Sequence, residues 1–299
     1  MTARRLRHPP RRSYAWALVR KAPADPAALH RPRQFAEWML DWRGLSLPVW
    51  DVEGDDPAGP TCVLTPGWGE SRVIGLSRVP PLARRCSRIL LWDPPGLGDA
   101  PPGPFLMGTR EHEALRALLD RAGVAPRSAV LFGWSAGAGT SIAAASSRDE
   151  RIAAVVAEAP YRVPWVPARN VMTAIGMPWT LIGPLTYAML GMRLGVGPRW
   201  KGFDRAILAA RLACPLLVIH GNADAVCPPS DGLDIAEALT AAGGNATLAL
   251  IPGGAHTDLW TNPATAPACA AALDAFLSNL RPASPPSPRV GEGRREATG

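Results

Sequence analysis

A serine stands at the centre of the pentapeptide GWSAG, residues 133–137. A serine hydroxyl is a weak nucleophile until a neighbouring base takes its proton. The pattern G-x-S-x-G is short enough to arise by chance in a chain with 29 glycines. Whether Ser135 is reactive therefore depends on a base and an acid elsewhere in the chain, and on the elements that position them.

Histidine is the usual base for such a serine, and the chain has five. Four of them lie in the N-terminal stretch, on the exposed face of an expected helix, or inside an apolar run: His8, His30, His112 and His220. Only His256, in PGGAHTDLW, follows directly on an expected strand, and it is also the last strand of the chain. His256 is therefore the candidate base.

A carboxylate should orient that histidine, and two candidates stand after strands. Asp224, in HGNAD, follows the apolar run 215–221 by three residues. Glu158 ends the run 152–160 and is the rival acid. The order serine, acid, histidine along the chain fits either carboxylate, with Asp224 preferred.

Apolar runs of strand length alternate with stretches of helical spacing. The expected strands cover residues 61–66, 88–93, 128–133, 152–160, 215–221 and 246–252. Strands that alternate with helices form a mostly parallel sheet with helices on both faces, and side chains that do chemistry gather where such strands end. The sequence thus predicts an α/β fold that brings Ser135, Asp224 and His256 together.

GWSAG lies between an expected strand and an expected helix at 136–147. A serine on so tight a strand-to-helix turn is strained, and side chains two residues before and after it would clash with neighbouring elements. Gly133 and Gly137 remove those side chains. The amide of Ala136, together with that of Trp68 in TPGWGES, is predicted to form an oxyanion hole.

These motifs resemble those of the α/β-hydrolase fold superfamily over residues 45–280. VIHGNAD is similar to the superfamily's acid-bearing turn, LLWDPPGLGDA to its D-x-x-G-x-G-x-S turn with Asp99 in place of serine, and TPGWG to its oxyanion loop with Pro66 in place of histidine. The resemblance implies nucleophile, acid and base roles for Ser135, Asp224 and His256, with no cofactor and no metal.

Residues 161–206 interrupt the alternation, where the resemblance implies a helical lid before the penultimate strand. The stretch 171–192 has no charged residue, and Gly and Pro break it, so a membrane span between two core strands is disfavoured. We expect an apolar acyl pocket, with four candidate substrate-binding residues: Met172, Met177, Trp179 and Leu190. The alternatives are a cap on the core or on a partner subunit, or contact with lipid.

The net charge of +7 comes from the tails. Residues 1–33 carry +8 and residues 281–299 carry +2, which leaves −3 for the rest. We expect residues 1–44 to be a basic, partly disordered arm and 281–299 to be a disordered tail. A nucleic-acid partner is disfavoured, whereas the arm or the lid could meet a membrane surface. The twin arginines before residues 13–19 lack the rest of an export signal.

The five cysteines form no C-x-x-C pair. We interpret them as small buried thiols in a reducing compartment, which favours a cytoplasmic location and disfavours a metal cluster. The function that these features favour is a serine hydrolase that cleaves an apolar carboxylic ester through an acyl-enzyme. An aminopeptidase or thioesterase with the same triad, or a silent binding protein of the same fold, is the alternative; the sequence sets no oligomeric state.

Overall fold

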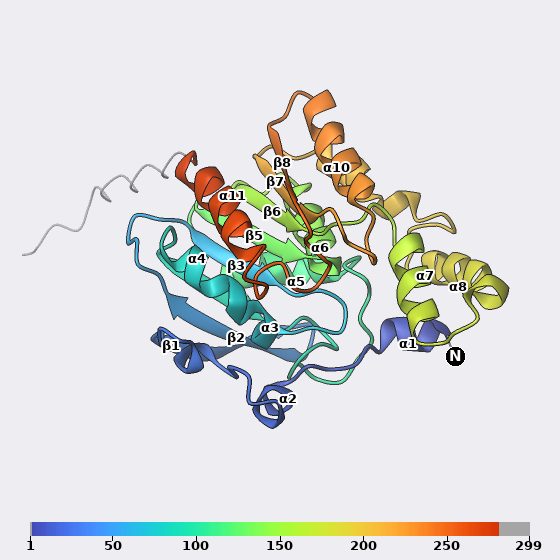
Figure 1. The fold of residues 1–299 in the computed structure, drawn as a ribbon, viewed down its shortest axis with the longest axis horizontal. Helices are drawn as coiled ribbons and strands as arrows, with labels where there is room; N and C mark the ends of the chain where they lie inside the picture. The colour runs from blue at the N-terminus through green and yellow to red at the C-terminus, as the bar shows by residue number, and fades with distance from the viewer. Residues whose placement is uncertain (1, 281–299) are drawn as a thin grey trace, which may run out of the picture.

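The computed structural model of the chain describes residues 2–280. The predicted C-terminal tail, residues 281–299, lies outside the described residues. An eight-stranded sheet runs through the middle of the molecule, with helices on both sides of it (Figure 1). The strands are β1 (Phe35–Trp42), β2 (Leu45–Glu53), β3 (Thr61–Thr65), β4 (Arg88–Trp92), β5 (Ala129–Trp134), β6 (Ile152–Glu158), β7 (Leu216–Gly221) and β8 (Ala246–Ile251).

The strand order across the sheet is β1-β2-β4-β3-β5-β6-β7-β8. Strand β2 runs antiparallel to both of its neighbours, and every pair from β4 to β8 is parallel. The six strands expected from the apolar runs are all present, with ends that differ by no more than two residues. All six residues of β5 are buried, as expected for a central strand covered on both faces.

The sheet begins earlier than predicted, because residues 35–42 form β1. Arg43 and Gly44 have φ values of 50° and 77°, and this pair of positive values builds a two-residue turn that joins β1 to β2. The prediction that residues 1–44 form an arm was therefore wrong for residues 35–42, which belong to the sheet. β1 lies at the edge of the sheet and is largely exposed, so it lacks the apolar run that marks the inner strands.

Two apolar clusters lie on the two faces of the sheet, and neighbouring strand residues alternate between them. Leu131 belongs to one cluster, whereas Val130 and Phe132 belong to the other. The first face is covered by α5 (Glu111–Arg121), α6 (Ala136–Ala145), α9 (Arg205–Ala209) and α10 (Pro229–Ala241), and the second by α3 (Arg72–Gly75), η2 (Leu76–Arg78), α4 (Val79–Ala83) and α11 (Ala266–Ser278). The predicted α/β class is confirmed.

The N-terminal arm, which we expected to be partly disordered, lies against the domain in the structure. It contains α1 (Thr2–Arg7), α2 (Tyr14–Val19) and the short η1 (Pro26–Ala28). The carbonyl of Arg7 accepts a hydrogen bond from the Phe105 amide at 2.7 Å, and Arg11 Nε donates to the Gly98 carbonyl at 2.9 Å. Ala17 is fully buried. Charge counting missed these contacts because backbone carbonyls and small apolar side chains make several of them.

The segment between β6 and β7 is helical, as expected for residues 161–206. It contains α7 (Trp165–Ala174), α8 (Trp179–Arg193) and η3 (Lys201–Phe203), and α7 and α8 lie beside α1 (Figure 1). The uncharged stretch is divided between the two helices, with Gly176 at φ +75° and Pro178 in the break. Across residues 2–280, every helix is too short or too polar to cross a bilayer.

The turn between β5 and α6 leaves no room for side chains on either side of Ser135. A Cβ on Gly133 would lie 2.2 Å from the Gly137 carbonyl oxygen, and one on Gly137 would lie 2.1 Å from the Thr65 carbonyl oxygen. Both obstacles are backbone atoms, which cannot move aside without shifting β3 or α6. Glycine is therefore required at both positions by the close approach of β3, β5 and α6, as predicted from the motif.

Gly137→Ala should lower the free energy of unfolding by about 3 kcal/mol or more, because the added methyl must displace the end of β3. Urea unfolding followed by circular dichroism measures this. Gly103→Ala is the matched control, since the nearest atom to its Cβ is 3.9 Å away, and it should cost about 0.5 kcal/mol or less. Equal stability of the two variants would contradict the close approach at Gly137.

Candidate active site

Ser135 lies at the tip of the turn between β5 and α6. Its backbone has φ 54° and ψ −118°, a strained combination for a residue with a side chain. The amide of Ser135 donates to the Glu158 carbonyl at 2.8 Å, which ties the turn to the end of β6. The strained backbone holds the hydroxyl beyond the end of the sheet, at the N-terminus of α6.

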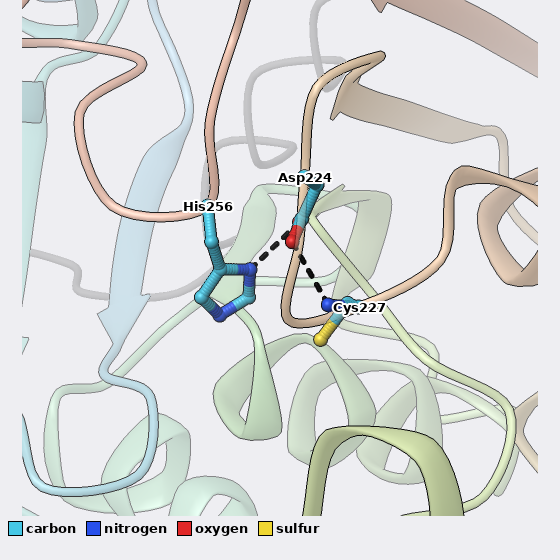
Figure 2. A group of neighbouring side chains, drawn as sticks. All are labelled: Asp224, Cys227 and His256. Atoms are coloured by element: carbon cyan, nitrogen blue, oxygen red, sulfur yellow. Dashed lines mark hydrogen bonds and ion pairs between the residues drawn. The ribbon is translucent and has the colours of Figure 1, made fainter. Parts of the chain in front are cut away.

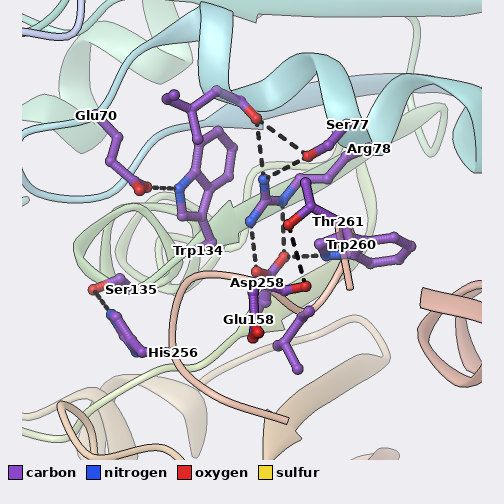
Figure 3. Close-up of polar contacts among 12 residues, drawn as sticks. Glu70, Ser77, Arg78, Trp134, Ser135, Glu158, His256, Asp258, Trp260 and Thr261 are labelled. Atoms are coloured by element: carbon purple, nitrogen blue, oxygen red, sulfur yellow. Dashed lines mark hydrogen bonds and ion pairs between the residues drawn. The ribbon is translucent and has the colours of Figure 1, made fainter. Parts of the chain in front are cut away.

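Ser135, His256 and Asp224 form a continuous line of hydrogen bonds. His256 Nε2 lies 3.2 Å from Ser135 Oγ, and His256 Nδ1 lies 2.7 Å from Asp224 Oδ2 (Figure 2 shows the second contact, Figure 3 the first). A neutral ring that donates through Nδ1 leaves Nε2 free to accept the serine proton. The structure thus brings together the three residues that the sequence predicted.

Asp224 is buried, and hydrogen-bond donors surround its carboxylate. Oδ1 accepts from the amides of Val226 and Cys227, both at 2.8 Å. His220 Nε2 lies 3.3 Å from Oδ2, on the same oxygen that His256 contacts. Burial opposes the charge, but His220, His256 and the Cys227 amide outweigh burial and lower the pKa of Asp224 well below its usual range. The carboxylate therefore stays ionised and fixes the orientation of His256.

Cys227 is a neighbour of these residues that the sequence analysis did not single out. One potential ligand atom from each of Asp224, Cys227 and His256 lies within 4.8 Å of the other two (Figure 2). Sulfur, oxygen and imidazole nitrogen are zinc ligands. A metal ion here would compete with the Asp224–His256 hydrogen bond. Burial raises the pKa of the Cys227 thiol. Its position three residues after Asp224 was visible in the sequence, but its orientation was not.

The rival acid, Glu158, faces away from His256 and is paired elsewhere. Its carboxylate accepts from Arg78 Nε at 2.8 Å, from Arg78 Nη2 at 2.5 Å and from Trp260 Nε1 at 2.7 Å (Figure 3). Arg78 also stacks 4.1 Å above the ring of Trp134. Glu158 is therefore part of a buried ion pair beneath the Ser135 turn, and the structure favours Asp224 as the acid.

The loop after β3 passes next to Ser135, as the predicted oxyanion hole requires. A Cβ on Gly67 would lie 3.2 Å from the Cβ of Ser135, so the backbone of the loop lies against the serine. The amides of Trp68 and Ala136 make none of the loop and turn hydrogen bonds found among residues 2–280. The indole Nε1 of Trp68 donates to the Leu6 carbonyl at 2.7 Å, which holds the loop against the N-terminal arm.

A cavity of about 210 Å³ opens beside Ser135 and His256. Its other walls come from the N-terminal arm, from α7 and from the loops after β3, before α5, before α7, after β7 and after β8. They are Leu6, Arg12, Trp68, Glu70, Met107, Tyr161, Pro164, Pro167, Ala168, Val171, Val226 and Thr257. Most of these side chains are apolar. The cavity has the size and lining of a site for part of a small organic molecule.

The four predicted substrate-binding residues do not line this cavity. Met172, Trp179 and Leu190 are buried in an apolar cluster, and Met177 packs against that cluster. The α7 residues that do line it include Val171. Other residues of the same segment line the cavity, because a uniformly uncharged stretch has no polar face from which to predict which side turns inward.

Two charged residues of the cavity were also missed. Glu70 accepts from Arg12 Nη1 at 3.0 Å, and its other oxygen accepts from the indole of Trp134. Glu70 directly follows the predicted oxyanion loop, so its place in the sequence was a usable signal. Arg12 and Leu6 gave no signal, because nothing local shows that the N-terminal arm returns to the loop after β3.

No protein-family model matches the chain, and no curated protein is significantly similar to it in sequence. Solved structures are similar in fold. An esterase from Pyrococcus furiosus superposes with a TM-score of 0.64 at 16% identity, over 83% of this chain and 91% of that one. An esterase from Rhodococcus sp. superposes with a TM-score of 0.60 at 20% identity, over 83% of this chain and 99% of that one. An acylaminoacyl peptidase from Pyrococcus horikoshii superposes with a TM-score of 0.61 at 14% identity, over 82% of this chain and 41% of that one.

These similarities, together with the sheet order, establish that the chain has the fold of the α/β-hydrolase superfamily. The resemblance inferred from the motifs is confirmed at the level of the fold. The fold does not fix the chemistry, which depends on the side chains of the site.

The pKa of His256 should lie above 6.5, the ordinary value for histidine. Burial tends to lower the pKa, but the ionised Asp224 carboxylate, 2.7 Å from Nδ1, favours the protonated ring and outweighs it. A titration followed by NMR of the imidazole protons measures this value. Asp224→Asn should lower the His256 pKa, whereas the remote Asp274→Asn, which breaks only a contact with Arg85, should leave it unchanged. A pKa that Asp224→Asn leaves unmoved would contradict the contact.

Proposed function

We propose that the protein is a serine hydrolase that cleaves an apolar carboxylic ester through an acyl-enzyme intermediate. The observation that carries the proposal is the line of bonds from Ser135 Oγ through His256 to Asp224, beside an apolar cavity. A serine, a histidine and a buried carboxylate in this arrangement activate the hydroxyl. The strained backbone of Ser135 supports it, since strain of this kind persists where the surrounding structure demands it.

In the first half-reaction, Ser135 Oγ attacks the ester carbonyl carbon while its proton passes to His256 Nε2. The amides of Trp68 and Ala136 stabilise the oxyanion, and the N-terminus of α6 adds a favourable dipole. Asp224 stabilises the positive charge on His256. The ring then protonates the departing alkoxide, which leaves the acyl group on Ser135.

In the second half-reaction, water replaces the alcohol. His256 Nε2 takes a proton from the water as its oxygen attacks the acyl carbon, and the same two amides hold the new oxyanion. The intermediate collapses, Ser135 Oγ regains its proton from His256, and the carboxylic acid leaves. This cycle requires only side chains, backbone amides and water.

The cavity supports an uncharged, apolar substrate. Val171, Ala168 and Leu6 present aliphatic surface, and burying a chain of methylene groups against such surface is favourable. The charge of Glu70 is matched by Arg12 at 3.0 Å, so the cavity offers no unmatched charge to a charged ligand. We further propose a cytoplasmic location, which the five free cysteines favour.

One observation favours a second candidate, an aminopeptidase. Glu70 lies in the cavity wall, and a carboxylate there would bind the amino group of a peptide if Arg12 moved aside. Glu70→Gln separates the two. It should leave ester turnover within a few-fold of the unmodified protein, but it should abolish cleavage of an amino-acid anilide if the carboxylate binds the amine.

Ser135→Ala should abolish labelling by a fluorophosphonate probe and lower kcat for p-nitrophenyl esters by about 10⁶-fold, because the nucleophile is removed. Ser141→Ala is the matched control. Ser141 is a buried serine of α6 with no hydrogen-bond partner for Oγ among the described residues, and its loss should change little. If the probe still labels the Ser135→Ala variant, Ser135 is not the nucleophile. If the probe fails to label even the unmodified protein, a silent binding protein of the same fold is favoured.

Ala168→Phe should shorten the cavity and lower kcat/KM for long-chain p-nitrophenyl esters by roughly tenfold or more relative to acetate. A long chain needs the space that the phenyl ring fills, whereas an acetyl group does not reach it. Ala174→Phe is the control, since Ala174 is exposed at the end of the same helix and outside the cavity. An equal loss on all chain lengths would show that α7 does not form the acyl site.

A further inference from the structure

Helix α8 turns an uncovered apolar face to the solvent. The face, called here the α8 outer face, consists of Leu181, Ile182, Leu185, Met189 and Met192, and Leu181 and Leu185 are 80% and 67% exposed. Each environment expected for the uncharged stretch 171–192, an acyl pocket, a packed cap or a lipid contact, would hide it from water, whereas this face is exposed. Exposed apolar surface of this extent on one element marks an interaction site.

The exposure follows from how α8 packs. Gly183 lies against the ring of Trp179, and Gly191 lies against Trp200, so the small residues face inward. Leu181, Leu185, Met189 and Met192 recur at intervals of three and four residues and therefore share the outer side of the helix. The break before α8 is also exposed and apolar, with Ile175 at 48%. Both faces of α8 are thus apolar, and the domain covers only one.

Basic residues border this face. Helix α1 packs beside α8 (Figure 1), and a cavity of about 360 Å³ between them is lined by Arg4, Arg7, His8, Met189, Leu190, Met192 and Arg193. None of these arginines forms an ion pair with a carboxylate of residues 2–280. The side chain of Arg5 is exposed next to them.

Acidic residues are missing from the segments that build this region. The sequence has no Asp or Glu from residue 2 to 24, nor from 159 to 203. An anionic partner therefore meets arginines with no competing carboxylate on either segment. The charge of the region and its apolar face call for a partner that is both anionic and apolar.

We infer that the α8 outer face and α1 dock onto an anionic lipid surface. The apolar side chains would enter the boundary between head groups and acyl chains, while Arg4, Arg5 and Arg193 lie at the level of the phosphates. Apolar insertion and a basic patch are the two signals that stable, reversible membrane attachment needs, and here they lie side by side.

A second copy of the chain fits the same face less well. In a twofold dimer both partners use the same surface, so the arginines of α1 and Arg193 from both copies would gather in one interface. Like charges brought together at an interface disfavour association. Lipid phosphates carry the opposite charge and avoid this repulsion.

The docking face and the candidate active site share α1. Leu6 of α1 lines the cavity beside Ser135, and the exposed Arg4 and Arg5 precede it by one turn or less. A lipid surface against α1 would therefore lie close to that cavity. The inference does not depend on the proposed hydrolase activity, and it is tested without measuring that activity.

The test is sedimentation of the full chain with vesicles of phosphatidylcholine alone and of phosphatidylcholine mixed with phosphatidylserine, at low and high salt. We expect binding to the mixed vesicles that is at least about tenfold tighter than to the neutral ones and that weakens as salt screens the arginines. No binding, or binding that is equal on both vesicles and insensitive to salt, would overturn the proposal.

Two sets of variants locate the surface. Leu181→Ser with Leu185→Ser should reduce binding to mixed vesicles by roughly tenfold or more, and so should Arg4→Glu with Arg5→Glu. The controls are Leu233→Ser, an exposed leucine of α10, and Arg211→Glu, an exposed arginine after α9; both should bind as the unmodified chain does. The proposed docking surface would be refuted if these variants bound mixed vesicles normally, or if the control variants lost binding to the same extent.

Circular dichroism and thermal unfolding check that the variants fold, which is expected because the substituted side chains contact solvent. Met192→Ser, alone, is the milder substitution if the double variant unfolds, and it should still weaken binding measurably. Light scattering of the unmodified chain completes the test. A dimer that Leu181→Ser with Leu185→Ser dissociates, without vesicle binding, would show that the face joins two copies instead of docking on lipid.

Discussion

The backbone of Ser135 has a positive φ, and much of the surrounding structure serves to hold it. The turn is possible only because Gly133 and Gly137 let β5, α6 and the end of β3 approach within distances that no side chain allows. The same approach brings the loop after β3 alongside Ser135. One steric constraint therefore sets both the direction of the hydroxyl and the place of the amides of Trp68 and Ala136.

Two buried carboxylates at the ends of neighbouring strands have different tasks, and their partners assign them. Glu158 is neutralised by Arg78 and supports the Ser135 turn from below, since its own carbonyl accepts the Ser135 amide. Among residues 2–280, Asp224 pairs with no arginine, and its partners there are two amides and two histidines. A carboxylate that is not paired with an arginine keeps a negative charge that can stabilise a protonated His256, as the proposed mechanism requires.

The helical insertion has two sides with different surroundings. Residues of α7 face the cavity beside Ser135, while the outer face of α8 meets solvent. The N-terminal arm joins both sides, because Leu6 lines the cavity and the arginines around it border α8. A basic segment that looked like a solvated tail is thus part of the wall of the candidate site.

The sequence by itself determined the inner strands, the turn at GWSAG, the pair Ser135 and His256, and two candidate acids, Asp224 and Glu158, with Asp224 preferred. Those features are local, since apolar runs mark buried strands and motifs mark the ends of strands. Only the tertiary structure decided the edge strand β1, the choice between Asp224 and Glu158, the place of Cys227, and which side of the uncharged insertion faces the cavity. The reason is physical: each depends on contacts between segments distant in the chain, and a residue's own neighbours in sequence carry no record of the partner that buries it or leaves it exposed.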